Sequence, residues 1–93
     1  MKFLASHDVQ RHFASYLRAR RRAQKLSRDR LAERSTVPAP TIKRFELTGE
    51  ISFRQLCLLW ETLDELSRLD ELCSEAPMPT TIEEVLSNAR TRR

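Results

Sequence analysis

Two prolines, Pro38 and Pro40, interrupt a stretch of helix-favouring residues and restrict where helices in this region can begin and end. A residue that precedes proline is pushed toward extended dihedral angles, so Val37 and Ala39 are expected to be extended. Pro40 is then expected as the first residue of a helix, where its missing N–H leaves no hydrogen bond unmade. This helix would run from Pro40 to about Leu47.

The segment before the prolines carries its own helix signals. Ser27 is a good N-cap, Asp29 suits the positive end of the helix dipole, and the helix is expected to end near Ser35. After the prolines, Ile42 and Phe45 recur at spacing three and predict one buried face. Two helices of about two turns each, joined by so short a connection, must cross steeply, as in a helix-turn-helix.

The rest of the chain also has helical patterns. Apolar residues at spacing four predict a helix over about 6–24, in which Ser6 serves as the N-cap. A capping box at Ser52–Gln55 predicts a further helix, whose apolar positions begin at Phe53. A turn near Asp64 would separate a last helix.

The only glycine of the chain, Gly49, is expected to end the third helix with a positive φ. β-rich folds and phosphate-binding loops use glycine at many turns, so a single glycine disfavours both. The sequence therefore predicts an all-α, five-helix domain over residues 1–76. Residues 77–93 would form a C-terminal tail, in which a second capping box allows an extra short helix.

Charge is divided unevenly along the chain. Residues 1–45 carry 12 Lys and Arg against 3 Asp and Glu, and residues 46–93 carry 5 against 10, giving net charges of +9 and −5. A strongly basic half favours a polyanionic partner such as nucleic acid. Two alternatives stay open: a solvated basic helix balanced by the acidic half of the same molecule, and an acidic protein partner.

Enzymatic and metal chemistry find no support in the sequence. Cys57 and Cys73 have neither disulfide-framework density nor metal-ligand spacing, and His7 and His12 are not at same-face helical spacing. We therefore expect no enzyme, no cofactor and no metal. No apolar run approaches the ~20 residues of a membrane span, and the N-terminus is not a secretory signal, so a cytoplasmic protein with no membrane partner is expected.

Two segments, LRARRRAQKLSRDRLAERSTVPAPTIKRFE and GEISFRQLCLLWETL, lie between Leu17 and Leu63 and resemble the Cro/phage-repressor-type (XRE) helix-turn-helix family. The family pattern is carried, in order, by Leu26-Ser27, Leu31-Ala32, Val37, Thr41-Ile42 and Glu46. The resemblance covers about half of the chain, and the ordered set is more specific than any one pair. It implies a Cro/repressor-like fold and sequence-specific binding to double-stranded operator DNA.

The resemblance also implies roles for individual residues. Ser27 and Arg28 match positions that contact phosphate, and Arg21 and Glu46 match a structural ion pair between the first and third helices. The positions that face bases are Ala39, Pro40, Thr41 and Arg44, with Pro38 offering apolar contact beside them and Lys43 lying nearer the DNA backbone.

The sequence departs from the family pattern in the turn and at the reading positions. Thr36 stands where the family usually has glycine, and Ala39 and Pro40 replace polar residues. The loop after the third helix is one residue shorter. Hydrogen bonding to bases must therefore depend on Arg44 and Thr41, and dimerisation or DNA shape would supply further affinity.

The resemblance and the charge together predict a homodimeric transcriptional repressor. The expected dimer surface comprises Trp60, Leu66, Leu69 and Leu72, with Trp60 equally able to be a core residue. Residues 41–52 resemble the HipB-like branch, which implies an antitoxin and autoregulator of a toxin–antitoxin operon with a HipA-like kinase toxin as partner. A phage or plasmid repressor is the alternative within DNA binding, and a helical protein-interaction module is the alternative outside it.

Overall fold

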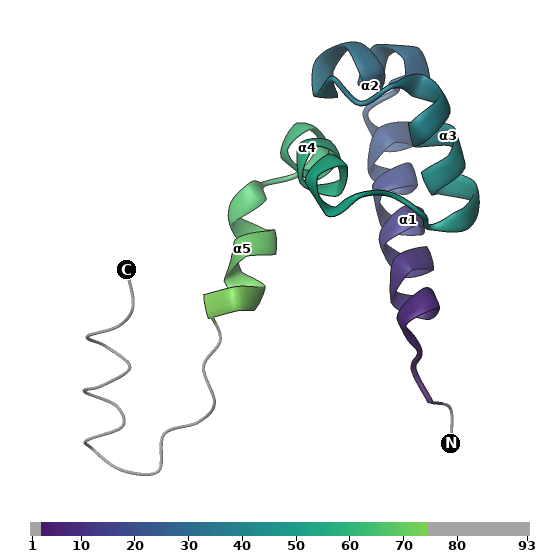
Figure 1. The fold of residues 1–93 in the computed structure, drawn as a ribbon. Coiled ribbons are helices and arrows are strands. Elements are labelled where there is room, and N and C mark those ends of the chain that lie inside the picture. Colours follow the sequence, from purple (N-terminus) through teal and green to yellow (C-terminus); the bar gives the residue numbers. More distant parts are fainter. Residues whose placement is uncertain (1–2, 75–93) are drawn as a thin grey trace.

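The computed structural model describes residues 3–74, and these form five α-helices without strands, which confirms the all-α expectation (Figure 1). The helices are α1 (Ser6–Ala23), α2 (Arg28–Ser35), α3 (Ala39–Thr48), α4 (Phe53–Leu63) and α5 (Leu66–Ser74). The expected domain boundary at residue 76 and the expected tail, 77–93, lie outside the described residues.

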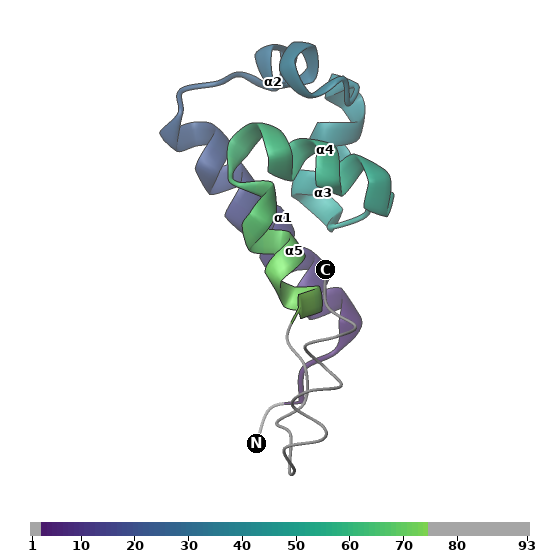
Figure 2. The ribbon, with the colours of Figure 1, turned by 90° about the vertical axis from the view of Figure 1, so that its left-hand side faces the viewer.

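The first helix, α1, is the longest, and two of the other helices pack against it. α3 packs against α1 and α2, and α4 packs against the same two helices (Figures 1 and 2). α5 packs against α4 and leads away from α2. α2 and α3 therefore form one end of the molecule, and α5 lies toward the other.

The core draws on four of the helices and on the turn between α2 and α3. Its largest fully buried side chains are Leu17, Leu31, Val37, Ile42, Phe45, Leu59 and Leu63. Burying each such side chain contributes about 1.5–3 kcal/mol relative to leaving it in water. Ile42 and Phe45 share one face of α3, as the spacing predicts, and they fix the opposite face of α3 toward solvent.

The helix ends confirm three of the expected caps. The backbone N–H of Arg30 donates to Ser27 Oγ over 3.1 Å, and the N–H of Gln55 donates to Ser52 Oγ over 3.1 Å. Gly49 adopts φ 83° at the end of α3, and its N–H donates to the carbonyl oxygen of Phe45 over 2.7 Å.

Two helix starts differ from expectation. α1 is capped by Ala5 rather than Ser6, and the N–H of Ala5 donates to the Asp8 carboxylate over 2.9 Å. Ala39 is helical rather than extended, with Pro38 as the N-cap. The steric preference of a residue before proline is therefore overridden at Ala39. Pro40 itself costs no hydrogen bond at this position, because the first N–H groups of a helix have no intrahelical partner.

Phe53 is also placed differently from the expected apolar face of its helix. It begins α4, and 73% of its surface is exposed. The burial pattern of α4 starts only with the half-buried Leu56 and continues through Leu59 and Leu63. A capping box predicts where a helix begins, but it does not show how far the core extends along the first turn.

Thr36 occupies the turn between α2 and α3 with φ 66° and ψ 8°, the left-handed conformation. This conformation costs a residue with a Cβ about 1–2 kcal/mol, and part of that is offset because glycine loses more chain entropy on folding. We expect Thr36→Gly to stabilise the fold by about 0.5–1 kcal/mol, measured by urea unfolding. Thr36→Ala keeps the Cβ and should recover less; equal gains from both variants would contradict the conformational explanation.

Candidate nucleic-acid interface

The solvent face of α3 carries two neighbouring cations. Lys43 and Arg44 are both exposed, on the side of α3 opposite the buried Ile42 and Phe45. Because the apolar pair fixes the rotation of the helix, both positive charges are held outside the molecule. With ten residues, α3 is about 15 Å long, comparable with the ~12 Å width of a DNA major groove.

The start of α3 presents small and apolar groups. Pro38 and Pro40 are exposed, and Ala39 and Thr41 are half-buried. Prolines offer no backbone N–H, so this end of α3 makes apolar contact except through the Thr41 hydroxyl. The expected reading positions therefore share one surface, where Arg44 is the strongest hydrogen-bond donor.

The N-terminus of α2 is exposed and forms a second candidate contact site. Ser27 is exposed and already accepts a hydrogen bond from the N–H of Arg30 as the helix cap. A helix N-terminus with free N–H groups is a favourable position for phosphate. Arg28, beside it, has a partner within the chain: its Nε donates to Glu46 Oε1 over 3.0 Å, and its side chain is 32% exposed.

A cluster of three charged side chains joins α1, α2 and α3. The expected ion pair is present: Arg21 Nε donates to Glu46 Oε2 over 2.7 Å, and Arg21 Nη2 donates to Glu46 Oε1 over 3.1 Å. Arg21 Nη1 also donates to the carbonyl oxygen of Leu26 over 2.8 Å. Arg28 completes the cluster through Glu46, and no pattern in the sequence indicates this third member.

Glu46 is the centre of this cluster, and its side chain is only 3% exposed. Burial opposes ionisation of its carboxyl group, but the hydrogen bonds and charges of Arg21 and Arg28 outweigh burial and hold the pKa of Glu46 below its ordinary value. The carboxylate therefore stays charged and fixes α3 against α1 and α2. Arg21 therefore has a structural role, as the resemblance implies.

The loop after α3 holds Arg44 in the free protein. Arg44 Nη2 lies 3.2 Å from Glu50 Oε1, and both side chains are more than half exposed. Thr48 Oγ1 donates to the carbonyl oxygen of Arg44 and accepts from the N–H of Glu50, which positions the loop. An exposed ion pair of this kind contributes at most about 1 kcal/mol, so the Arg44 side chain can exchange Glu50 for another acceptor at little cost.

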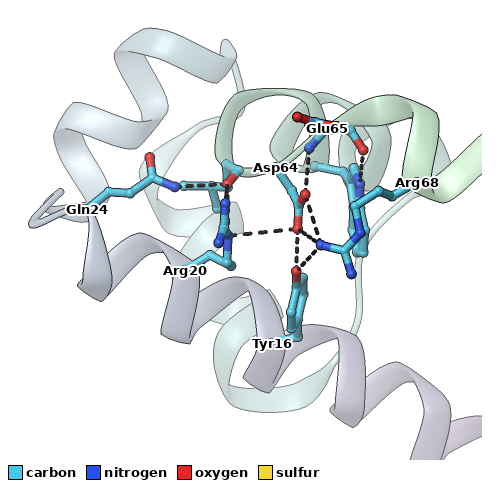
Figure 3. Close-up of polar contacts among 8 residues, drawn as sticks. Tyr16, Arg20, Gln24, Asp64, Glu65 and Arg68 are labelled. Atoms are coloured by element: carbon cyan, nitrogen blue, oxygen red, sulfur yellow. Dashed lines mark hydrogen bonds and ion pairs between the residues drawn. The ribbon is translucent and has the colours of Figure 1, made fainter.

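A different polar network fixes the turn between α4 and α5 to α1 (Figure 3). The Tyr16 hydroxyl donates to Asp64 Oδ2, and Arg68 Nη1 lies 3.0 Å from the same oxygen. Arg20 and Gln24 both donate to the carbonyl oxygen of Leu63. Arg20 therefore has a structural role. In the sequence it stands in a row of basic residues, and no pattern separates it from the others.

The hydrogen bonds and charges of this network lower the pKa of Asp64. The hydrogen bond from Tyr16 is the largest cause that holds the pKa of Asp64 below its ordinary value, and the N–H of Glu65 and the charges of Arg68 and Arg20 act in the same direction against burial. A carboxyl group whose folded pKa is lowered stabilises the fold above its unfolded pKa and loses that contribution as the pH falls toward the folded pKa.

We therefore expect the destabilisation caused by Asp64→Asn to shrink as the pH is lowered from about 7 to below about 4. Tyr16→Phe removes the hydroxyl that lowers the pKa of Asp64 most. The destabilisation that it causes should also become smaller as the pH is lowered. Thermal unfolding of both variants and the wild-type chain across this pH range is the measurement. A difference in melting temperature that does not change with pH would contradict the assigned role of Asp64.

Trp60 lies in the core rather than on a dimer surface, which corrects one of the expected interface positions. Its side chain is buried, its ring stacks on Tyr16 at a centroid distance of 5.3 Å, and Nε1 donates to the carbonyl oxygen of Glu65. Both its indole N–H and its ring face therefore have partners within the same chain. The three leucines expected on the dimer surface are more accessible than Trp60. Leu66 and Leu72 are exposed, and Leu69 packs partly against the core.

Comparisons with protein-family models, with curated proteins and with solved structures found no match to this chain. Within residues 3–74, no helix is both long and apolar enough to cross a membrane. The same residues contain no group of three His, Cys, Asp or Glu side chains that is arranged to hold a metal ion. The assignment of a function therefore depends on the geometry of α2, α3 and the loop that follows them.

Proposed function

We propose that this chain is a sequence-specific DNA-binding repressor whose α3 enters the major groove. The observation that carries the proposal is the orientation of α3: buried Ile42 and Phe45 hold it against the core, and exposed Lys43 and Arg44 lie on its outer side. A short helix that follows a tight turn and presents cations outward has the form of a recognition helix. A protein-interaction module has no need for both charges there.

Contacts in the proposed complex follow from side-chain chemistry. Arg44 leaves Glu50 and makes a bidentate hydrogen bond to guanine O6 and N7, and Thr41 offers a hydroxyl or a methyl group to a neighbouring base. Lys43 neutralises a phosphate, and the N–H groups at the start of α2 beside Ser27 donate hydrogen bonds to another, which supplies affinity for any sequence. Because only Arg44 and Thr41 form hydrogen bonds to bases, each half-site has modest selectivity.

A homodimer that places two α3 helices about 34 Å apart would read two half-sites in successive major grooves. Repression then follows from occupancy of the operator. The resemblance to the HipB-like branch extends the proposal to an antitoxin that regulates its own operon and binds a HipA-like kinase toxin. A phage or plasmid repressor is the alternative biological setting for the same surface.

Fluorescence anisotropy with DNA from upstream of the chain's own reading frame tests the proposal, in parallel with random DNA of equal length. Specific binding that weakens steeply with salt supports the repressor, because phosphate contacts release counterions. Equal affinity for both DNAs, or none for either, contradicts sequence-specific binding and favours the interaction module.

Arg44→Ala is expected to reduce affinity for the specific site by about 1–3 kcal/mol and to relax the preference over random DNA. Arg34→Ala is the matched control, because it removes the same charge from an exposed position at the far end of α2 from Ser27. Anisotropy titrations of both variants on the same two DNAs provide the comparison. If Arg44→Ala and Arg34→Ala behaved alike, the assignment of Arg44 to base reading would be wrong. Arg28 is a poorer control, since its loss also disturbs Glu46.

A further inference from the structure

An apolar groove of about 370 Å³ lies between the first half of α1, the start of α4 and the outer part of α5. Its walls include Val9, Phe13, Leu56, Leu69 and Leu72. The groove lies in the angle between α1 and α5 below α4 in Figure 1. The ion-pair cluster between α1, α2 and α3 and the polar network of Figure 3 lie outside it.

Within residues 3–74, this groove is incompletely covered. Phe53 at its edge is 73% exposed, Leu72 is 64% exposed, and no residue of α5 is buried. A helix of nine residues gains little stability from its own backbone and depends on packing. The exposed apolar side chains therefore mark a surface that a further apolar segment covers.

The chain leaves its last described helix at this groove. Leu72 and Cys73 line the groove, and α5 ends one residue later at Ser74. Residues 75–93 follow in the sequence, and their branched aliphatic residues begin at Ile82. An extended chain spans at most about 3.5 Å per residue, so the stretch before Ile82 can reach about 25 Å. This exceeds the length of α5, about 13 Å, so the tail can return along the groove.

We propose that the C-terminal tail of the same chain covers the groove, with Ile82, Val85 and Leu86 packed against Phe53 and Leu72. The three tail residues stand at positions i, i+3 and i+4, the spacing that places apolar side chains on one side of a helix. An amphipathic helix laid into an apolar groove is a recurrent way to cover such a surface.

The charges beside the groove favour this occupant. Arg11 on α1 and Arg54 on α4 are exposed next to groove residues, and neither has an ion-pair partner within residues 3–74. Glu83 and Glu84 follow Ile82 in the tail and supply the opposite charge. A segment of the same chain is also present at an effective concentration in the millimolar range, which a separate molecule has to match through its own concentration.

Cys73 provides the test, because its exposed thiol lines the groove, whereas Cys57 does not line it. Alkylation of the full chain by iodoacetamide, followed by mass spectrometry of both cysteine peptides, measures how accessible each thiol is. In the wild-type chain, the covered groove is expected to slow the modification of Cys73. Ile82→Asp combined with Leu86→Asp should raise the Cys73 rate about 10-fold, because the open state becomes about ten times more populated, and should leave the Cys57 rate unchanged.

Ser87→Asp is the matched control, because it adds the same charge to the tail at a position off the apolar side of the expected helix. It should leave both alkylation rates at their wild-type values. Circular dichroism of each variant checks that the helices remain folded. In the wild-type chain, a nuclear Overhauser effect between the Leu86 methyl groups and the Phe53 ring is expected, and this measurement needs no substitution.

Equal Cys73 rates in the wild-type chain and the double aspartate variant, or Leu86 methyl groups without contact to Phe53, would overturn the proposal. The wild-type Cys73 rate should also be independent of protein concentration, because the cover belongs to the same chain. A Cys73 rate that falls as the protein concentration rises would show that a second copy covers the groove, and would contradict the tail. None of these measurements involves DNA, so their outcome is independent of the proposed function.

Discussion

Glu46→Ala is expected to destabilise the fold by about 3–5 kcal/mol, the usual effect of removing one partner from a buried ion pair. Arg21 and Arg28 would lose their shared acceptor, and the Arg21 side chain is only 10% exposed, so its guanidinium would keep a charge with little water around it. For a domain of this size such a loss lowers the melting temperature by roughly 12 °C or more. Thermal and urea unfolding monitored by circular dichroism measure the effect.

Glu33→Ala is the matched control for this experiment. Glu33 also pairs with an arginine, Arg30, but over 3.7 Å and with both side chains about two-thirds exposed. Its loss is expected to change stability by less than about 0.5 kcal/mol, because exposed pairs contribute little. Similar effects of the two substitutions would show that the Glu46 cluster does not hold α3 in place.

Gly49→Ala is expected to destabilise the fold by about 2–4 kcal/mol, through two separate contributions. The backbone at Gly49 has φ 83°, which L-residues with a Cβ rarely adopt. A Cβ at this position would also lie 3.1 Å from backbone and side-chain carbons of Gln10 in α1. Urea unfolding of the variant measures the loss.

Gly49→Asn separates the two contributions. Asparagine adopts the left-handed conformation more readily than alanine but carries the same Cβ. We expect Gly49→Asn to recover part of the stability lost in Gly49→Ala and to stay below the wild-type chain because the contact with Gln10 remains. Wild-type stability in either variant would contradict the close approach of the loop to α1.

Local features of the fold were predictable because they depend on residues close together in the sequence. Ser27 and Ser52 cap their helices as expected, and Gly49 ends α3 with a positive φ. Each of these depends on side-chain and backbone chemistry within three or four residues. Ala39 shows the limit of such rules, because a helix N-terminus accepts a proline at either of its first two positions.

Contacts between distant residues were predictable only in part. The pair of Arg21 and Glu46 follows from the family resemblance, but the third member, Arg28, does not. Tyr16 and Asp64 are 48 residues apart, and neither has a pattern that singles it out. Such contacts depend on how helices cross, which the period of apolar residues does not fix.

The burial of Trp60 illustrates the same limit. From the sequence, its ring fits a dimer surface as well as a core, since both environments are apolar with a polar edge. Only the positions of Tyr16 and Glu65 around it decide for the core. The exposure of Phe53 is the converse, because its apolar character does not reveal that the buried part of α4 begins one turn later, at Leu56.

An NMR titration of the ¹⁵N-labelled chain with its specific DNA site tests most directly whether α3 is the recognition helix. The largest amide shifts are expected in α3 and at the start of α2, around Arg44, Lys43 and Ser27, while the amides around Tyr16 and Asp64 should change little. Amide shifts centred on the Tyr16–Asp64 side, with α3 unchanged, would contradict a recognition role for α3.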